Sequence, residues 1–184
     1  MLYYKIDLSN MINTNMGYKI VIVGDVKVGK TTFVNLLKKR GFTTQYNATM
    51  GVDVSSHDIN ISNGNAIQVM LWDCAGNSAL GGLRDGYYSH ADAAIIMFDL
   101  CDRTTLCTIP NWYNSITRSI NNDKVFFIGN KVDSNTTITS SDISNMGIRM
   151  SKYLEFSCKS CVQPKHVFQM IFRHLLNDHN LRVC

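Results

Sequence analysis

The sequence of 184 residues contains no long hydrophobic run, no long basic run and no internal repeat. No window reaches the roughly 18 apolar residues that a membrane-spanning helix needs, and no signal-peptide pattern opens the chain. We therefore expect a soluble, intracellular protein. Because about 45% of the residues are apolar, the chain can bury one core of ordinary size, and its length suggests one domain.

The chain also has little net charge and no regular spacing of cysteines. Net charge is +4, and the largest basic cluster, residues 38–40, closes a predicted helix, where cations complement the helix dipole. We expect no nucleic-acid partner. The six cysteines form no regular framework, so reduced thiols are expected. Cys158 and Cys161 lack the second pair that a zinc site needs. A prenylation signal needs cysteine at the position of Leu181, so no lipid anchor is expected.

What the chain does contain is a phosphate-binding pattern, G-x-x-x-x-G-K-[ST], between a predicted strand (18–23) and a predicted helix (32–40). Where a strand turns into a helix, backbone N–H groups and the positive end of the helix dipole point to one place, which suits phosphates. Lys30 is expected to reach the β- and γ-phosphates, and Thr31 is expected to bind Mg²⁺. The predicted phosphate-binding residues are Gly24, Asp25, Val26, Lys27, Val28, Gly29, Lys30, Thr31, Thr32 and Gly76.

Three later segments follow predicted strands and complete a nucleotide site. Asp73 ends an apolar strand, where an acid can hold Mg²⁺ through water. Asp133 can accept hydrogen bonds from N1–H and the amine of guanine, whereas adenine would leave it unpaired, so the site should reject ATP. The backbone after Ser157 can reach the guanine carbonyl. The guanine-binding residues predicted from these segments are Asn130, Lys131, Asp133, Ser157, Cys158 and Lys159.

These segments resemble the Ras superfamily of small GTPases and, within it, the Ran branch, over roughly residues 18–183. The general motifs are the phosphate-binding loop, D-x-x-G at 73–76 and N-K-x-D at 130–133, and the runs typical of Ran lie at 81–88, 94–99 and 110–112. The resemblance implies that Thr49 is the switch I threonine on Mg²⁺ and that Phe42 packs beside the nucleotide. It assigns catalytic roles to Lys30, Thr49, Gly76 and Asn77.

The expected organisation is a polar extension over residues 1–16 and one small GTPase domain over 17–184. Strands alternate with helices, except for an antiparallel pair at 52–61 and 66–73 joined by an Asn-Gly turn. Helices are expected over 110–121 and 163–178, with Pro164 in the first turn. The predicted fold is three-layer α/β, with a six-stranded, mostly parallel sheet, one antiparallel strand, and nucleotide at the carboxyl ends of the strands.

Departures from the family pattern suggest slow hydrolysis. Val26 and Lys27 stand where the family usually has glycine, and Asn77 stands where it has a glutamine that positions water. Asn77 is shorter by about the 1.5 Å of one C–C bond. Val26 fills space that the arginine of an activating protein would use, and such an arginine contributes roughly 10³ to 10⁵ in rate. Alternatively, neighbouring substitutions compensate and Asn77 works through an adjusted switch II.

Recognition surfaces are also altered. Ran proteins end in an acidic tail that meets a basic patch, but this chain stops at Cys184 and the matching segment, 146–150, has one positive charge. Two functions are compatible with this pattern: a monomeric, Mg²⁺-dependent GTP/GDP switch in nucleocytoplasmic transport, or a non-hydrolysing mimic that occupies Ran partners. The resemblance implies transport receptors, an exchange factor and a GTPase-activating protein as partners, and a location in nucleus and cytoplasm.

Overall fold

The computed structural model describes residues 17–38, 42, 47–61, 66–76, 84–161, 164–177 and 183. The strands are β1 Tyr18–Val23, β2 Val52–Asn60, β3 Ala66–Cys74, β4 Ala93–Asp99, β5 Val125–Asn130 and β6 Tyr153–Glu155. The α-helices are α1 Lys30–Leu37, α2 Arg84–Tyr88, α3 Arg103–Cys107, α4 Ile109–Ile116, α5 Ser140–Asn145 and α6 Lys165–Leu175. Two 3₁₀ helices, η3 Asn122–Lys124 and η4 Met150–Lys152, precede β5 and β6.

The strands form a six-stranded sheet in the order β2-β3-β1-β4-β5-β6. The β2–β3 pair is antiparallel, and the other pairs are parallel. Every residue of β4 and β5 is buried, as expected for parallel strands covered on both faces. The predicted α/β fold, with a mostly parallel sheet and one antiparallel strand, is therefore confirmed.

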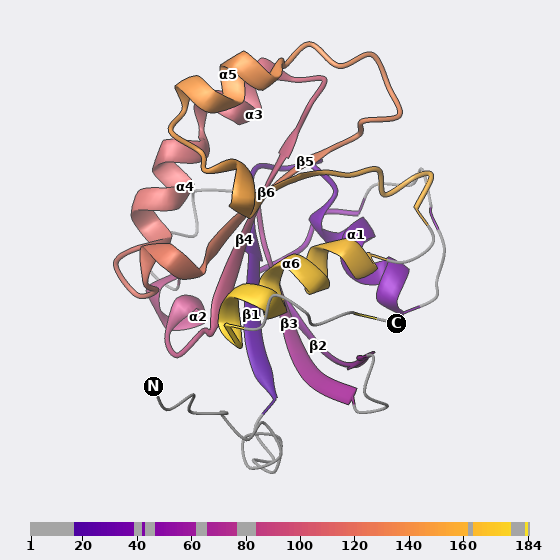
Figure 1. The fold of residues 1–184 in the computed structure, drawn as a ribbon, viewed down its shortest axis with the longest axis vertical. Helices are drawn as coiled ribbons and strands as arrows, with labels where there is room; N and C mark the ends of the chain where they lie inside the picture. Colours follow the sequence, from indigo (N-terminus) through magenta and orange to yellow (C-terminus); the bar gives the residue numbers. More distant parts are fainter. Residues whose placement is uncertain are drawn as a thin grey trace, which may run out of the picture.

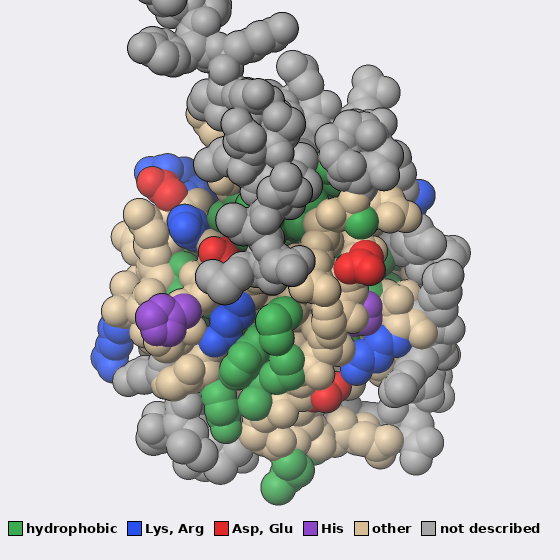
Figure 2. Space-filling view, turned by 90° about the horizontal axis from the view of Figure 1, so that it is seen from below, with side chains coloured by type: hydrophobic (Ala, Val, Ile, Leu, Met, Phe, Trp, Pro, Cys, Tyr) green, Lys and Arg blue, Asp and Glu red, His purple; other side chains and the backbone are tan. Residues whose placement is uncertain are grey.

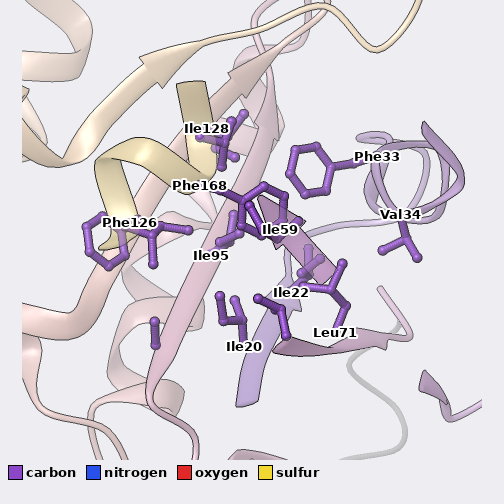
Figure 3. Packing of buried hydrophobic residues seen from close by; sticks show 14 of the residues in the cluster. Ile20, Ile22, Phe33, Val34, Ile59, Leu71, Ile95, Phe126, Ile128 and Phe168 are labelled. Carbon is purple, nitrogen blue, oxygen red and sulfur yellow. The ribbon is translucent and has the colours of Figure 1, made fainter. Parts of the chain in front are cut away.

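Helices lie on both faces of the sheet and make the outer two of the three layers (Figure 1). On one face, α1 and α6 contribute Phe33 and Phe168, whose ring centroids lie 6.1 Å apart above the strands (Figure 3). On the other face, α3, α4 and α5 contribute Leu106, Trp112 and Ile143 to a second cluster. One hydrophobic cluster thus packs against each face of the sheet. The loops at the carboxyl ends of its strands contain the predicted nucleotide-binding residues.

The predicted elements differ from the observed ones mainly at their ends. The helix predicted over 110–121 is α4, which begins at Ile109 and ends at Ile116. The helix predicted over 163–178 is α6, and Pro164 is its N-cap rather than part of its first turn. Helices α2, α3 and α5 have only five or six residues each, too few to show a helical period, and were not predicted. The extension over 1–16 and the turn over 62–65 lie outside the described residues.

The antiparallel pair has an outer face that is partly apolar. Val54 and Met70, on adjacent strands, are exposed by 41% and 38%. Seen from below, hydrophobic side chains form a compact group bordered by charged ones (Figure 2). Lys19 Nζ lies 3.8 Å from the centroid of the Trp72 ring. Trp72 Nε1 is buried and has no hydrogen-bond partner within the described part of the chain.

Candidate nucleotide-binding site

The loop between β1 and α1 has the geometry that its sequence predicts. Lys30 is buried, and its Nζ donates to the backbone oxygens of Gly24 at 2.9 Å and Asp25 at 2.7 Å. Gly24 and Gly29 have φ of 136° and 106°, values that favour glycine. A Cβ on Gly24 would collide with the Met97 carbonyl oxygen. The chain therefore passes close to β4 and brings the first amides of α1 to the carboxyl end of the sheet.

The middle of this loop departs from the compact form that glycines would give. Val26 is 49% exposed, whereas Val28 is fully buried. Lys27 has φ of 63°, a left-handed conformation that is strained for a residue with a Cβ. Thr32 is partly buried in the first turn of α1.

The three residues predicted to hold Mg²⁺ lie together. Thr31 Oγ1 donates to Asp73 Oδ2 at 2.6 Å and lies 2.9 Å from Thr49 Oγ1. Thr49 Oγ1 is 3.5 Å from the same carboxylate oxygen. Asp73 is fully buried, and its Oδ1 has no hydrogen-bond partner among the described residues. Burial raises the pKa of Asp73, while the hydrogen bond from Thr31 opposes that shift.

This donor set fits a divalent cation. A buried carboxylate with an unpaired oxygen is unfavourable unless a cation or donor meets it. Two hydroxyl oxygens and one carboxylate are hard ligands of the kind that Mg²⁺ takes, with water and phosphate completing its octahedron. We therefore assign Thr31, Thr49 and Asp73 as the residues that would hold Mg²⁺. No cluster of three or more His, Cys, Asp or Glu able to hold a metal occurs in the described segments.

The predicted base site also comes together. Asn130 Nδ2 donates to the Val28 oxygen at 2.8 Å, and Asn130 Oδ1 accepts from Cys158 N at 3.0 Å. This amide therefore joins the phosphate-binding loop to the loop after β6. Asn130 is 2% exposed, so these bonds are well shielded from water.

The carboxylate expected to read guanine is oriented by its neighbours. Ser157 Oγ donates to Asp133 Oδ1 at 2.5 Å, and Lys159 Nζ lies 3.9 Å from Oδ2. The Ser157 hydrogen bond, more than the Lys159 charge, lowers the pKa of Asp133. Asp133 is therefore ionised at neutral pH and can act only as an acceptor.

Lys131 and Phe42 are less fully defined. Lys131 has φ of 70° and forms an ion pair with Asp99 at the end of β4. Its ammonium group is thus held beside the base site by an acid that sequence reasoning did not select. Phe42 is 45% exposed, and residues 39–41 and 43–46 around it are outside the described part. Its predicted contact with nucleotide stays a prediction.

The residues predicted to position water are only partly described. A Cβ on Gly76 would lie 2.6 Å from Asp25 C and Val26 N, so this glycine touches the phosphate-binding loop. The neighbouring amide, Ala75 N, donates to the Gly51 oxygen at 2.8 Å, which links the segment after Thr49 (switch I) to the segment that begins at Gly76 (switch II). Asn77 lies outside the described residues, so its catalytic role stays a prediction.

Sequence reasoning missed residues that support the site from a distance. Asp25 accepts hydrogen bonds from Thr108 Oγ1 and Trp112 Nε1, both at 2.7 Å. In the sequence, Trp112 stood out only as part of the run at 110–112 that is typical of Ran. The signal that could have identified Asp99, the partner of Lys131, is its position at the end of a strand. A cavity of about 350 Å³ lies elsewhere, between α4, β5 and η4, and none of the predicted site residues lines it.

None of the helices in the described segments is long and apolar enough to cross a membrane. A family model described as Ras family matches residues 19–177, which is most of the chain.

Proposed function

The chain belongs to the Ras family of GTP-binding switch proteins, and we infer that it is a Ran-like member that requires Mg²⁺ and hydrolyses GTP slowly. The observation that carries slow hydrolysis is the placement of Val26. This side chain is 49% exposed in the loop that Gly76 touches, and in the proposed site this loop would surround the γ-phosphate that water attacks. A branched side chain there occupies space that an activating arginine needs.

The requirement for Mg²⁺ is supported by the buried Asp73 carboxylate. Its Oδ1 has no donor within the described structure, and the Thr31 and Thr49 hydroxyl groups lie beside its other oxygen. The ion would neutralise charge on the β- and γ-phosphates during transfer. In the GTP state, Thr31 and Thr49 would ligate the ion directly, and Asp73 would act through water.

The Ran assignment rests on sequence runs rather than on contacts. The run at 110–112 includes Trp112, whose indole reaches the phosphate-binding loop, so at least this part has a structural role. On this assignment the chain acts in nucleocytoplasmic transport, in nucleus and cytoplasm. Its partners would be transport receptors, an exchange factor and a GTPase-activating protein, and it would work as a monomer.

A second candidate is a GTP-bound mimic that does not hydrolyse and occupies the partners of another Ran protein. The segment matching the Ran basic patch favours it. Arg149, the one cation between Met146 and Met150, lies 3.3 Å from Asp123 Oδ1, so its charge is already partly compensated. A protein with kept nucleotide contacts and altered partner surfaces would bind only some of the Ran partners.

Single-turnover hydrolysis separates the two candidates. Phosphate release from bound GTP should be slow in the wild type, with little response to a Ran-activating protein. Asn77→Gln should recover part of the intrinsic rate, and Val26→Gly should mainly restore the response to the activator. Asn77→Ala and Val26→Ile are the matched controls and should give no gain. No release from any variant favours the mimic, whereas wild-type turnover equal to that of an activated Ran would refute impaired hydrolysis.

The transport role has its own test. The GTP-bound chain should bind an importin-type transport receptor, and the GDP-bound chain should not. Equal binding of both nucleotide states, or of neither, would contradict the Ran assignment while leaving nucleotide binding intact.

A further inference from the structure

The phosphate-binding loop is anchored to the opposite layer of the molecule through one side chain. Asp25 Oδ1 accepts from Trp112 Nε1 at 2.7 Å, and Oδ2 accepts from Thr108 Oγ1 at 2.7 Å. Thr108 lies between α3 and α4, and Trp112 lies in α4, where it is 5% exposed. Two donors thus hold both carboxylate oxygens at the short distances of charge-assisted bonds.

The backbone of the same residue contacts two groups of the nucleotide site. The Asp25 carbonyl oxygen accepts from Lys30 Nζ at 2.7 Å. A Cβ on Gly76 would lie 2.6 Å from Asp25 C, so the start of switch II rests against this peptide unit. Rotation of the peptide unit would therefore move the acceptor that orients Lys30 and the surface that Gly76 contacts.

The negative charge of Asp25 is a second reason why its two hydrogen bonds matter. Asp25 is an acid in a loop that has to receive a polyanion, and a free carboxylate would repel phosphate. Trp112 belongs to the hydrophobic cluster on the face of the sheet opposite α1. Its indole N–H and the Thr108 hydroxyl therefore hold the carboxylate toward the α4 layer.

We propose that Asp25 is a positioning residue: anchored by Thr108 and Trp112, it fixes the loop so that Lys30 and the loop amides face the β- and γ-phosphates. Loss of the anchor lets the loop relax and speeds nucleotide release. This inference rests on the phosphate site of the proposed function and adds to it a structural support from the α3–α4 junction.

The chain offers a conservative variant that should keep the anchor. In Asp25→Asn, the amide oxygen can accept from Trp112 and the amide N–H can donate to Thr108 Oγ1. Thr108 can then donate its own hydrogen to the Thr105 oxygen, 3.0 Å away. Asp25→Ala removes both bonds, Thr108→Val removes one donor and keeps the side-chain volume, and Trp112→Phe removes the other and keeps an aromatic ring.

The experiment measures dissociation of a fluorescent GDP analogue from the full chain with Mg²⁺. Because hydrogen bonds to charged groups are strong, Asp25→Ala should dissociate about tenfold faster than wild type, and Thr108→Val and Trp112→Phe about three- to tenfold faster. Asp25→Asn should stay within about twofold. Ile116→Val, a buried change one turn further along α4, should lower the melting temperature without changing dissociation.

An NMR signal separates positioning from general loss of stability. The Trp112 indole N–H should move upfield in Asp25→Ala and stay near its wild-type position in Asp25→Asn. The Trp72 indole N–H, which has no partner among the described residues, is the internal reference.

Three results would overturn the proposal. The first is wild-type dissociation in Asp25→Ala with a shifted Trp112 signal. The second is equal acceleration by Asp25→Asn and Asp25→Ala, which would assign the effect to charge. The third is acceleration by Ile116→Val equal to that of Trp112→Phe. A wild-type chain that binds neither GDP nor GTP would instead refute the phosphate site itself.

Discussion

Asp133 is the residue predicted to decide the choice of base. The Ser157 hydrogen bond lowers its pKa and fixes one oxygen, so the carboxylate is an ionised acceptor that the proposed function pairs with the guanine edge. Asp133→Asn should weaken GTP binding by about 10²-fold or more, because two bonds to a charged acceptor are lost. It should also gain affinity for xanthosine triphosphate, since the amide can donate to the new carbonyl.

Competition titration with both nucleotides tests this prediction. Ser157→Ala is the control, because it removes the orienting bond, keeps the carboxylate, and should weaken GTP binding without any gain for the xanthine nucleotide. Wild-type protein that binds ATP as well as GTP would show that the base is not read in this way.

The left-handed backbone conformation of Lys27 has a cost in folding stability that substitution can measure. Its φ of 63° places a side chain in the left-handed region, where an L-residue costs roughly 1–2 kcal/mol. Lys27→Gly should raise the free energy of unfolding by about 0.5–1 kcal/mol, because relief of strain exceeds the extra entropy of unfolded glycine. Lys27→Ala keeps the Cβ and loses the lysine contacts, so it should gain nothing. Urea denaturation of the nucleotide-free wild type and both variants measures these free energies of unfolding.

The placement of site residues was predictable where the pattern is local. Lys30 and Thr31 follow from eight consecutive residues, because one strand–loop–helix turn fixes their direction. The supporting partners could not be predicted in the same way. Trp112 is 87 positions from Asp25, and Asp99 is 32 positions from Lys131, so these pairs exist only after the sheet has formed.

At the scale of elements, the short helix α5 depends on its first turn. Thr139 and Asp142 form a reciprocal capping box, and Arg103 bonds both oxygens of Asp142 from α3, at 2.5 and 3.1 Å. The Arg103 bond, followed by those from Thr139, holds the pKa of Asp142 well below its usual range.

This capping interaction predicts an acid-dependent loss of stability. Because the folded-state pKa lies below the unfolded value of about 3.9, the contribution of Asp142 is complete above about pH 5 and is lost as pH falls toward the folded pKa. The difference in urea midpoint between wild type and Asp142→Asn should therefore shrink from about pH 5 to about pH 2.5. Asp58→Asn, an exposed change on β2, controls for lost charge. A constant difference across that range would contradict the prediction.

Elements were predictable in proportion to their length and burial. The largely apolar strands β1 and β5 stand out in the sequence, and the predicted strand over 18–23 has the bounds of β1. Helix α5 has the capping residues Thr139 and Asp142 but only six residues, so its local signal is real and its period is not visible.

For the molecule as a whole, the buried charge of Asp73 links metal binding to stability. Its carboxylate is fully buried with one oxygen unpaired among the described residues, so the metal-free state bears a desolvation cost. With GDP bound, Mg²⁺ at about 100 times its Kd should raise the melting temperature by about 5–10 °C, and a chelator should reverse this.

Asp73→Asn tests the assignment. The variant should lose the Mg²⁺ effect, and its metal-free form should be at least as stable as metal-free wild type, because a neutral amide is easier to bury. Asp53→Asn, on the adjacent strand, should keep the effect. An unchanged Mg²⁺ shift in Asp73→Asn would place the ion elsewhere.

The burial of Cys158 in this site makes the chain its own probe of local opening. Burial raises the pKa of its thiol to about 12, and its Sγ faces the Gly29 oxygen at 3.8 Å. At pH 8 only about one molecule in ten thousand would carry the thiolate there, so alkylation has to wait for the base loop to open. Cys107 is exposed and should react at once. The extent of alkylation at Cys158 relative to Cys107, measured by mass spectrometry over time, would give the rate at which the base loop opens. No engineered dye is needed.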